Sequence, residues 1–141
     1  MTNAQRASLL GLSVLMVFAG VMHFVRPAPF IDIVPDYLPA PRTLVYLSGI
    51  AEILGGLGIL LPATRRLAAY GLVALFVCVF PANVHMAVHD ITPTGAPDLP
   101  DWLPWARLPL QLLFIYWALV VARMTPDNRS PRTAQTAGPP Q

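Results

Sequence analysis

The chain has 141 residues, of which 55% are hydrophobic and only 11% are charged. An ordinary soluble domain carries roughly 25% charged residues, so this chain has too few charges to cover a surface that faces water. Its net charge of +2 is too small and too scattered for a nucleic-acid interface. We therefore expect an integral membrane protein whose main partner is the lipid bilayer and which does not bind nucleic acid.

Four apolar stretches are each long enough to cross the hydrocarbon core of a bilayer, which takes roughly 17–25 helical residues. They are Ser8–Val25, Leu44–Leu61, Leu67–Val88 and Trp102–Ala122. Apolar side chains surround each stretch instead of following one stripe, as in helices that face lipid. The first stretch could also be a cleaved signal peptide, but it is longer than the usual apolar core of about 7–15 residues. The predicted fold class is all-α, a four-helix membrane bundle over residues 1–124.

The arginines indicate how this bundle is oriented, because short cytoplasmic loops retain an excess of positive residues. The N-terminus, the second loop and the C-terminal tail contain Arg6, Arg65, Arg66, Arg123, Arg129 and Arg132. In the first loop, arginines are balanced by aspartates, and the third loop is acidic. We therefore predict a multi-pass protein of the inner (plasma) membrane with both termini in the cytoplasm.

Two segments outside the spans have distinct compositions. The first outer loop, Pro27–Pro41, places apolar side chains between prolines. We predict that it lies in the membrane interface with a short helix from Ala28 to Val34, and it is either an apolar turn or a lid over the bundle. Residues 125–141 are rich in Pro, Thr and Ser without an apolar pattern, which predicts a disordered cytoplasmic tail.

Polar side chains inside the spans are the candidate site, because each is costly in a bilayer and needs a partner. Glu52 lies about 12 Å into the second span at a rise of 1.5 Å per residue, which places it in the outer half of the bilayer. Small residues share its helix face and would let a neighbouring helix approach closely. We predict that Glu52 pairs with Arg107 of the fourth span, one turn from Gln111.

Two further polar side chains lie near the outer ends of the other spans, His23 in the first span and Asn83 in the third. The predicted polar core, or ligand-binding set, is His23, Glu52, Asn83, Arg107 and Gln111. An ideal helix points Asn83 and His85 about 160° apart, so both face the bundle only if Pro81 distorts the turn, and we favour Asn83.

His85 and His89 form a secondary candidate pair. Their i, i+4 spacing allows two imidazoles to bind one metal ion, and His23 would supply a third nitrogen. The glutamate of the metalloprotease pattern is missing after His85. We expect two interfacial histidines and no metal site.

Polar and proline positions also form a series of short motifs. These motifs are His23-Phe24, Arg26-Pro-x-Pro-Phe, Val34-Pro-x-Tyr-Leu-Pro, Leu47-Ser-Gly-x-Ala-Glu-Ile-Leu-Gly-Gly-Leu-Gly, Phe80-Pro-Ala-Asn-x-x-Met86 and Arg107-Leu-Pro-Leu-Gln111. They resemble the DoxX-like family of small four-helix membrane proteins over about residues 8–123. The family motif falls on the same five polar residues.

The resemblance implies a function only in outline. The family is named for a small subunit of an archaeal thiosulfate:quinone oxidoreductase and is distantly similar to eukaryotic four-helix cargo receptors and receptor chaperones. It implies an accessory subunit instead of an enzyme that acts alone. Such a subunit would bind a small hydrophobic or quinone-like ligand in the outer leaflet and support a membrane or periplasmic redox partner. Cys78 is the only cysteine, which argues against a disulfide-relay role.

Other functions stay open at this point. One is a membrane enzyme that uses Glu52 and His23 for proton transfer. Another is a chaperone or sorting adaptor for the transmembrane segments of other proteins. The residues do not identify a cofactor, although a quinone is one candidate. Whether the chain forms a homo-oligomer is also left open.

The predicted orientation can be tested with reporter fusions. Reporters placed after Arg66 and after Arg123 should be cytoplasmic, and reporters near Ala40 and Gly95 should be external, because the arginine-rich segments stay inside. An external reporter signal at Arg66 would contradict the arrangement with both termini inside.

Overall fold

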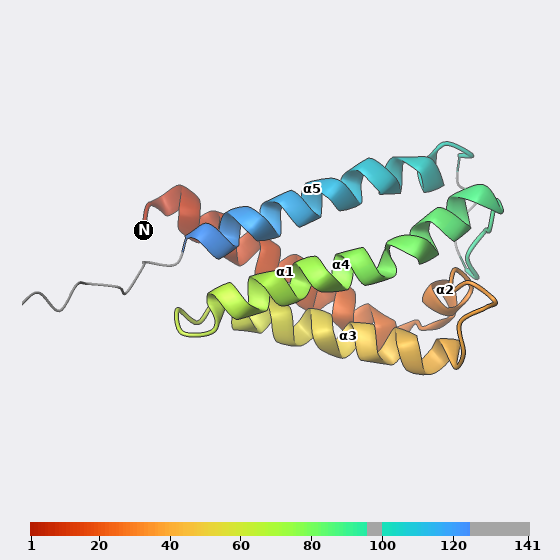
Figure 1. Ribbon diagram of the computed structural model, residues 1–141, viewed down its shortest axis with the longest axis horizontal. Helices are drawn as coiled ribbons and strands as arrows, with labels where there is room; N and C mark the ends of the chain where they lie inside the picture. Colours follow the sequence, from red (N-terminus) through yellow and green to blue (C-terminus); the bar gives the residue numbers. More distant parts are fainter. Residues whose placement is uncertain (96–99, 125–141) are drawn as a thin grey trace, which may run out of the picture.

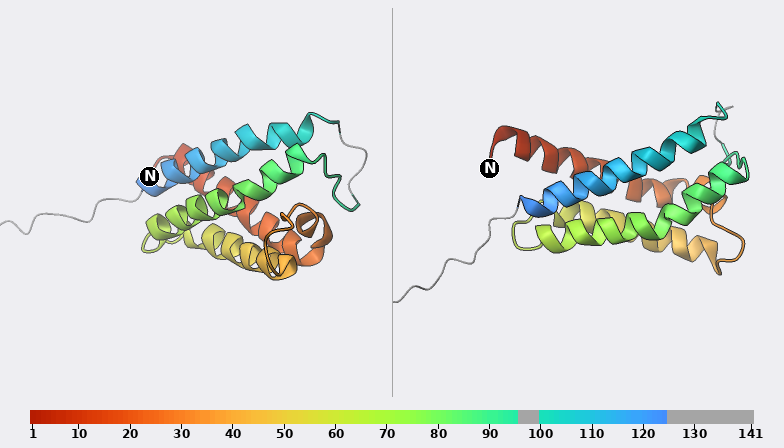
Figure 2. Two further views of the ribbon diagram at one scale, coloured as in Figure 1. Left: turned by 45° about the vertical axis from the view of Figure 1, so that its right-hand side comes forward. Right: turned by 45° about the horizontal axis from the view of Figure 1, so that its top comes forward.

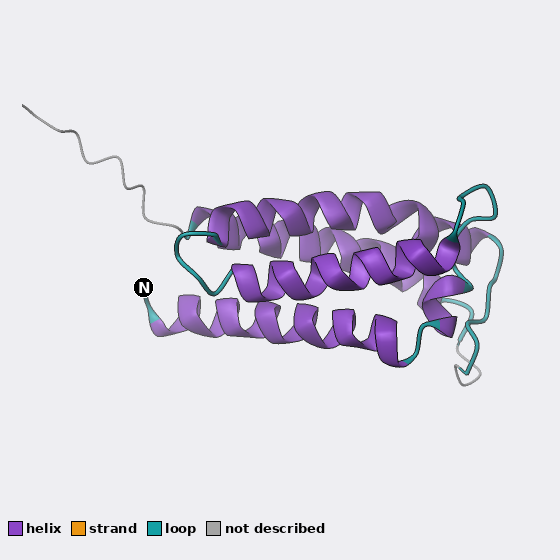
Figure 3. Cartoon of the chain, turned by 90° about the horizontal axis from the view of Figure 1, so that it is seen from below, coloured by secondary structure: helices purple, strands orange, loops and turns teal. Residues whose placement is uncertain are grey.

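The computed structural model describes residues 1–95 and 100–124, and all regular structure in these residues is helical. The helices are α1 (Asn3–Val25), α2 (Ala28–Ile31), α3 (Pro41–Gly58), α4 (Arg65–Val88) and α5 (Leu103–Arg123). The four long helices run alongside one another (Figures 1 and 3). The N-terminus, the α3–α4 loop and the end of α5 lie at one end of the molecule, which we call the N-terminal end. The opposite end, where α2 lies, is the α2 end.

Each of the four predicted spans coincides with one long helix to within a few residues. The largest difference is at the start of α1, where Thr2 and Gln5 form a capping box that extends the helix to Asn3. The short helix predicted from Ala28 to Val34 is only four residues long and ends at Ile31. The predicted disordered tail, residues 125–141, lies outside the described residues.

Three of the helices, α1, α4 and α5, are long and apolar enough to cross a membrane. Helix α3 has 18 residues and is not among them, because residues such as Arg42, Ser48 and Glu52 lower its mean hydropathy. Large apolar side chains, among them Phe18 and Leu67, are exposed along the outside of the molecule. So much exposed apolar surface is unusual for a soluble monomer, and together with the three apolar helices it indicates a membrane protein.

Glycines bring α1 and α3 into close contact. A Cβ atom on Gly20 would lie 2.6 Å from the carbonyl oxygen of Gly49, and one on Gly49 would lie 2.8 Å from the Cβ of His23. Further along the same contact, Gly56 faces the backbone of Ser13. Small residues allow helix backbones to meet in this way within a membrane. The close approach brings the faces that carry His23 and Glu52 together.

Helices α3 and α4, in contrast, meet closely near the N-terminal end. There, a Cβ atom on Gly55 would collide with Leu72, and one on Gly58 would lie 2.7 Å from Ala68. Figure 1 and the left view of Figure 2 show the two helices separating towards the α2 end. The molecule is therefore built from two helix pairs, α1 with α3 and α4 with α5.

The apolar core joins the two pairs on the N-terminal side. Its buried residues come from α1, α4 and α5 and from Ile59, which directly follows α3: Leu9, Leu12, Met16, Ile59, Ala69, Leu72, Phe76, Ala118, Val121 and Ala122. A hydrogen bond from the Trp117 indole to the Ser8 hydroxyl, 2.7 Å long, links α5 to α1 in the same region. The pairs are thus packed together at one end and held apart at the other.

A buried arginine closes the turn between α3 and α4. The Nε of Arg65 donates to the carbonyl of Ile59 at 2.8 Å, and its Nη2 donates to the carbonyl of Leu60 at 3.2 Å. Carbonyls at the end of a helix have no partner within the helix and must find one elsewhere. Arg65 supplies that partner and fixes the point at which α4 begins.

The glycine contact between α1 and α3 predicts a clear difference between two alanine variants. Gly49→Ala should lower the free energy of unfolding by about 1–3 kcal/mol, the usual cost of overpacking a close contact. Gly71→Ala is the matched control, because no atom lies within 4 Å of the Cβ that it would add. Unfolding midpoints measured in detergent test this, and equal midpoints for the two variants would contradict the proposed contact.

Candidate functional site

A cavity of about 750 Å³ lies between the two helix pairs, in the half of the molecule nearer the α2 end. All four long helices contribute to its wall, and Phe30, Ile33, Val34 and Pro35 from the first loop line it as well. Its volume falls within the range of about 300–1,000 Å³ that is typical of small-molecule sites. The separation of α3 from α4 therefore creates a space of the size that a ligand needs.

The cavity brings together all of the residues predicted to form the polar core. His23, Glu52, Asn83, Arg107 and Gln111 all line it. Ser48 also lines it and shares the helix face of Glu52, but its hydroxyl donates to the carbonyl of Val45 at 2.8 Å. Most of the remaining lining residues are apolar. An apolar cavity with a few convergent polar groups is the usual form of a small-molecule site.

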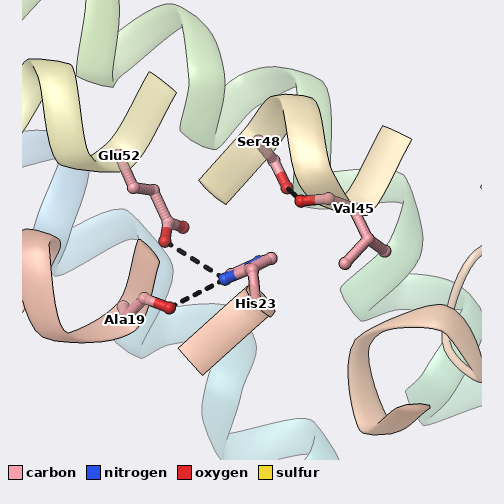
Figure 4. Close-up of polar contacts among 5 residues, drawn as sticks. All are labelled: Ala19, His23, Val45, Ser48 and Glu52. Carbon is pink, nitrogen blue, oxygen red and sulfur yellow. Dashed lines mark hydrogen bonds and ion pairs between the residues drawn. The ribbon is translucent and has the colours of Figure 1, made fainter. Parts of the chain in front are cut away.

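His23 and Glu52 lie against each other across the α1–α3 contact (Figure 4). The Nδ1 of His23 donates to the carbonyl of Ala19 at 2.8 Å and lies 3.4 Å from the Oε2 of Glu52. That oxygen is buried and has no hydrogen-bond partner among the described residues, so its contact with His23 is electrostatic. The His23 ring also stacks on Phe30, with ring centroids 3.8 Å apart. The imidazole is thus held in place from two sides, while one carboxylate oxygen remains unsatisfied.

The predicted pair between Glu52 and Arg107 is wrong in this structure. Within the described residues the carboxylate of Glu52 has an ion-pair contact with His23 alone, and Arg107 extends its Nη1 to within 3.7 Å of the Met86 sulfur. Glu52 and Arg107 do line the same cavity. They belong to different helix pairs, however, and depth along a helix does not determine which helices are neighbours.

Asn83 and Gln111 connect the two helices of the other pair. Asn83 donates through Nδ2 to the Oε1 of Gln111 at 2.8 Å, and Gln111 donates in turn to the carbonyl of Phe76. Pro81 lies in this part of α4 and has no backbone N–H to donate to the carbonyl one turn earlier. Gln111 thus contacts α4 about one turn before Pro81, and Asn83 is the polar side chain of this part of α4 that lines the cavity.

The two remaining histidines lie away from this site. The rings of His85 and His89 are 4.3 Å apart, and the Nδ1 of His89 donates to the carbonyl of His85 at 3.0 Å. Neither residue lines the cavity, so His23 does not join them. Among the described residues, no group of three His, Cys, Asp or Glu side chains could hold a metal ion.

One contact at the α2 end had no signal in the sequence. The carboxylate of Asp32 accepts a hydrogen bond of 2.7 Å from the backbone N–H of Thr94. This bond joins the first outer loop to the segment that follows α4. The loop that covers the cavity is therefore held in place from both helix pairs.

A comparison with known protein families assigns the chain to one of them. The model of the family described as "Domain of unknown function (DUF8561)" matches residues 12–122. The chain belongs to this family. The DUF8561 match includes every residue that lines the cavity. No curated protein and no solved structure matches the chain. The resemblance to DoxX-like proteins stays a prediction, and the family's description gives no function.

The structure predicts which partner of Glu52 is energetically coupled to it. In a double-mutant cycle, Glu52→Leu and His23→Leu should show a coupling energy of about 0.5–2 kcal/mol, because each removes the same contact. Glu52→Leu and Arg107→Leu should be additive to within about 0.5 kcal/mol, because the two side chains are not in contact. Unfolding free energies of the single and double variants measure both cycles. Coupling to Arg107 in place of His23 would contradict the arrangement seen here.

Proposed function

We propose that all four long helices cross the inner (plasma) membrane and that both termini are cytoplasmic. The length of α3 supports this, because its 18 residues extend about 27 Å at 1.5 Å per residue, close to the thickness of the hydrocarbon core. A stripe of exposed apolar residues follows its outer face: Leu44, Leu47, Ile50, Leu54 and Leu57. The two ends of the helical region lie at the same end of the molecule as the arginine-rich loop. In this orientation the cavity lies in the outer leaflet.

We further propose that the cavity binds a small hydrophobic or quinone-like ligand. The observation that carries this proposal is the unused hydrogen-bonding capacity of a mostly apolar cavity. Glu52 presents a buried oxygen that accepts no hydrogen bond, and Arg107 has no carboxylate partner among the described residues. The unsatisfied oxygen of Glu52 is buried and Arg107 is partly buried, so a ligand that forms hydrogen bonds with both would bind favourably.

A quinone has the chemistry that this pair of groups requires. It is a flat apolar ring with oxygen atoms at opposite ends, so one oxygen could accept from Arg107 on one helix pair. The other oxygen would face Glu52 and His23 on the other pair and, in the reduced form, would donate to the carboxylate. We therefore propose that the chain is an accessory subunit for a membrane or periplasmic redox partner. This role is inferred by analogy with the DoxX-like family.

A second candidate is a membrane enzyme in which Glu52 and His23 transfer protons. The 3.4 Å approach of the His23 imidazole to the Glu52 carboxylate favours it, because this distance is only slightly longer than the roughly 2.6–3.2 Å over which a general acid or base transfers a proton. Turnover by the purified protein alone would favour this candidate. Binding without turnover favours the accessory subunit.

The ligand can be sought directly and then confirmed by titration. Mass spectrometry of small molecules extracted with the gently purified protein identifies what it carries. A short-chain quinone should raise the unfolding midpoint of the unchanged protein as its concentration increases, because a ligand of the native state stabilises it. Arg107→Met should weaken this binding by about tenfold or more, since hydrogen bonds to charged groups contribute about 1.5–3 kcal/mol.

Arg42→Met is the matched control for this titration. Arg42 is exposed, lies at the same end of the molecule and does not line the cavity. It should bind the quinone as the unchanged protein does. Equal effects of the two variants, or no quinone binding to the unchanged protein, would contradict the proposal.

A further inference from the structure

The wall of the cavity is not equally covered on all sides. The lining residues of α1 are all at least partly buried, whereas several lining residues of α3 and α4 are exposed, as are Leu110 of α5 and Leu38 of the first loop. The exposed ones on α3 and α4 are Leu44, Leu47, Ala51, Cys78 and Pro81. We call these five residues the side opening. Leu47 is 57% exposed although it lines the cavity, so the cavity reaches the outside of the molecule beside it.

The spacing of these residues places them along one strip of α3 and one strip of α4. Leu44, Leu47 and Ala51 follow the i, i+3, i+7 pattern of a single helix face, and Cys78 and Pro81 are three apart on α4. Helices α3 and α4 separate towards the α2 end (Figure 1), and the residues of both strips line the same cavity. Because exposed side chains of both helices line one cavity, the side opening lies between α3 and α4.

The α2 end, by contrast, is covered except beside Leu38, a lining residue of the first loop that is 36% exposed. Ile33 and Pro35 are buried against the cavity, and the hydrogen bond from Thr94 to Asp32 holds their loop in place. A ligand that came from water would have to displace these side chains and break that bond. A ligand that came from the lipid would have to pass only apolar side chains and one thiol.

We propose that the cavity is loaded from the bilayer through the side opening. Its ligand is a lipid-soluble molecule with a polar head and a long apolar chain. The head lies between Glu52 and Arg107, and the chain passes over Leu47 and Cys78 into the surrounding lipid. This inference rests on the proposed function and specifies the class of ligand and its route.

Two physical arguments favour a chain that leaves sideways. The polar groups lie inside the cavity and the side opening is apolar, so a molecule with one polar end has a single favourable orientation. The chain stays in lipid throughout, so it avoids the unfavourable transfer of apolar surface into water that the route through the α2 end would require. Such a ligand can also be much longer than the cavity, because the chain need not fit within it.

The test compares two ligands that share a head group. One is a quinone without a chain and the other carries an isoprenoid chain, and both are titrated against the full chain in lipid nanodiscs. Ala51→Trp places a bulky ring in the side opening, and Ala74→Trp is the matched control, since Ala74 is exposed on α4 but does not line the cavity. Ala51→Trp should weaken binding of the long-chain quinone by about tenfold or more beyond its effect on the chainless quinone, because only the chain passes through the side opening. Ala74→Trp should affect neither.

Cys78 provides a second measurement that does not depend on a variant. It is the only cysteine of the chain and lies in the side opening, so its alkylation by a lipid-soluble maleimide reports access to this gap. The long-chain quinone should slow the alkylation, and the chainless quinone should slow it much less.

The outcomes separate this inference from the proposed function. If both quinones bind but Ala51→Trp and Cys78 alkylation fail to distinguish them, the side opening is overturned while ligand binding stands. If neither quinone binds to the unchanged protein, the proposed function is overturned, and the ligand class inferred here falls with it.

Discussion

The placement of glycines along α3 is the constraint on which the rest of this structure depends. Within a membrane, apolar side chains gain little by leaving lipid for one another, so helices associate where their backbones can approach closely. Gly49 and Gly56 provide that approach to α1, whereas Gly55 and Gly58 provide it to α4 only towards the N-terminal end. Helix α3 therefore follows α1 and diverges from α4. The cavity is the geometric result of this divergence.

The same constraint determines the chemistry of the polar groups. Because α3 follows α1, Glu52 meets a histidine of α1 and does not reach the arginine of α5. The carboxylate of Glu52 and the guanidinium cation of Arg107 are thereby kept on opposite helix pairs. A direct ion pair would satisfy both groups and leave nothing for a ligand to bind. Because they are separated, Arg107 offers a hydrogen-bond donor and Glu52 an acceptor to the same apolar cavity. The cavity is therefore a candidate site for ligand binding.

Much of the fold could be predicted from the sequence, since the lengths of the apolar stretches locate the four long helices and only the ends needed correction. The polar set was also predictable, because Glu52, Asn83 and Arg107 are conspicuous in apolar surroundings and had to converge. Their partners were not predictable. Small residues around Glu52 indicate that some helix packs there, but not which one. The bond between Asp32 and Thr94 joins residues far apart in the chain, and neither has a local signature.

The turn between α3 and α4 shows that adjacent residues of one type need not be equivalent. Arg65 is buried and its guanidinium holds the carbonyls of Ile59 and Leu60, whereas Arg66 is exposed and lies over the ring of Tyr70. A forked, permanently charged group is needed at the first position, and a lysine would not replace it. In the proposed orientation, only Arg66 is exposed and available to lipid phosphates. The number of basic residues in a loop therefore overstates the charge with which that loop is anchored at the membrane surface.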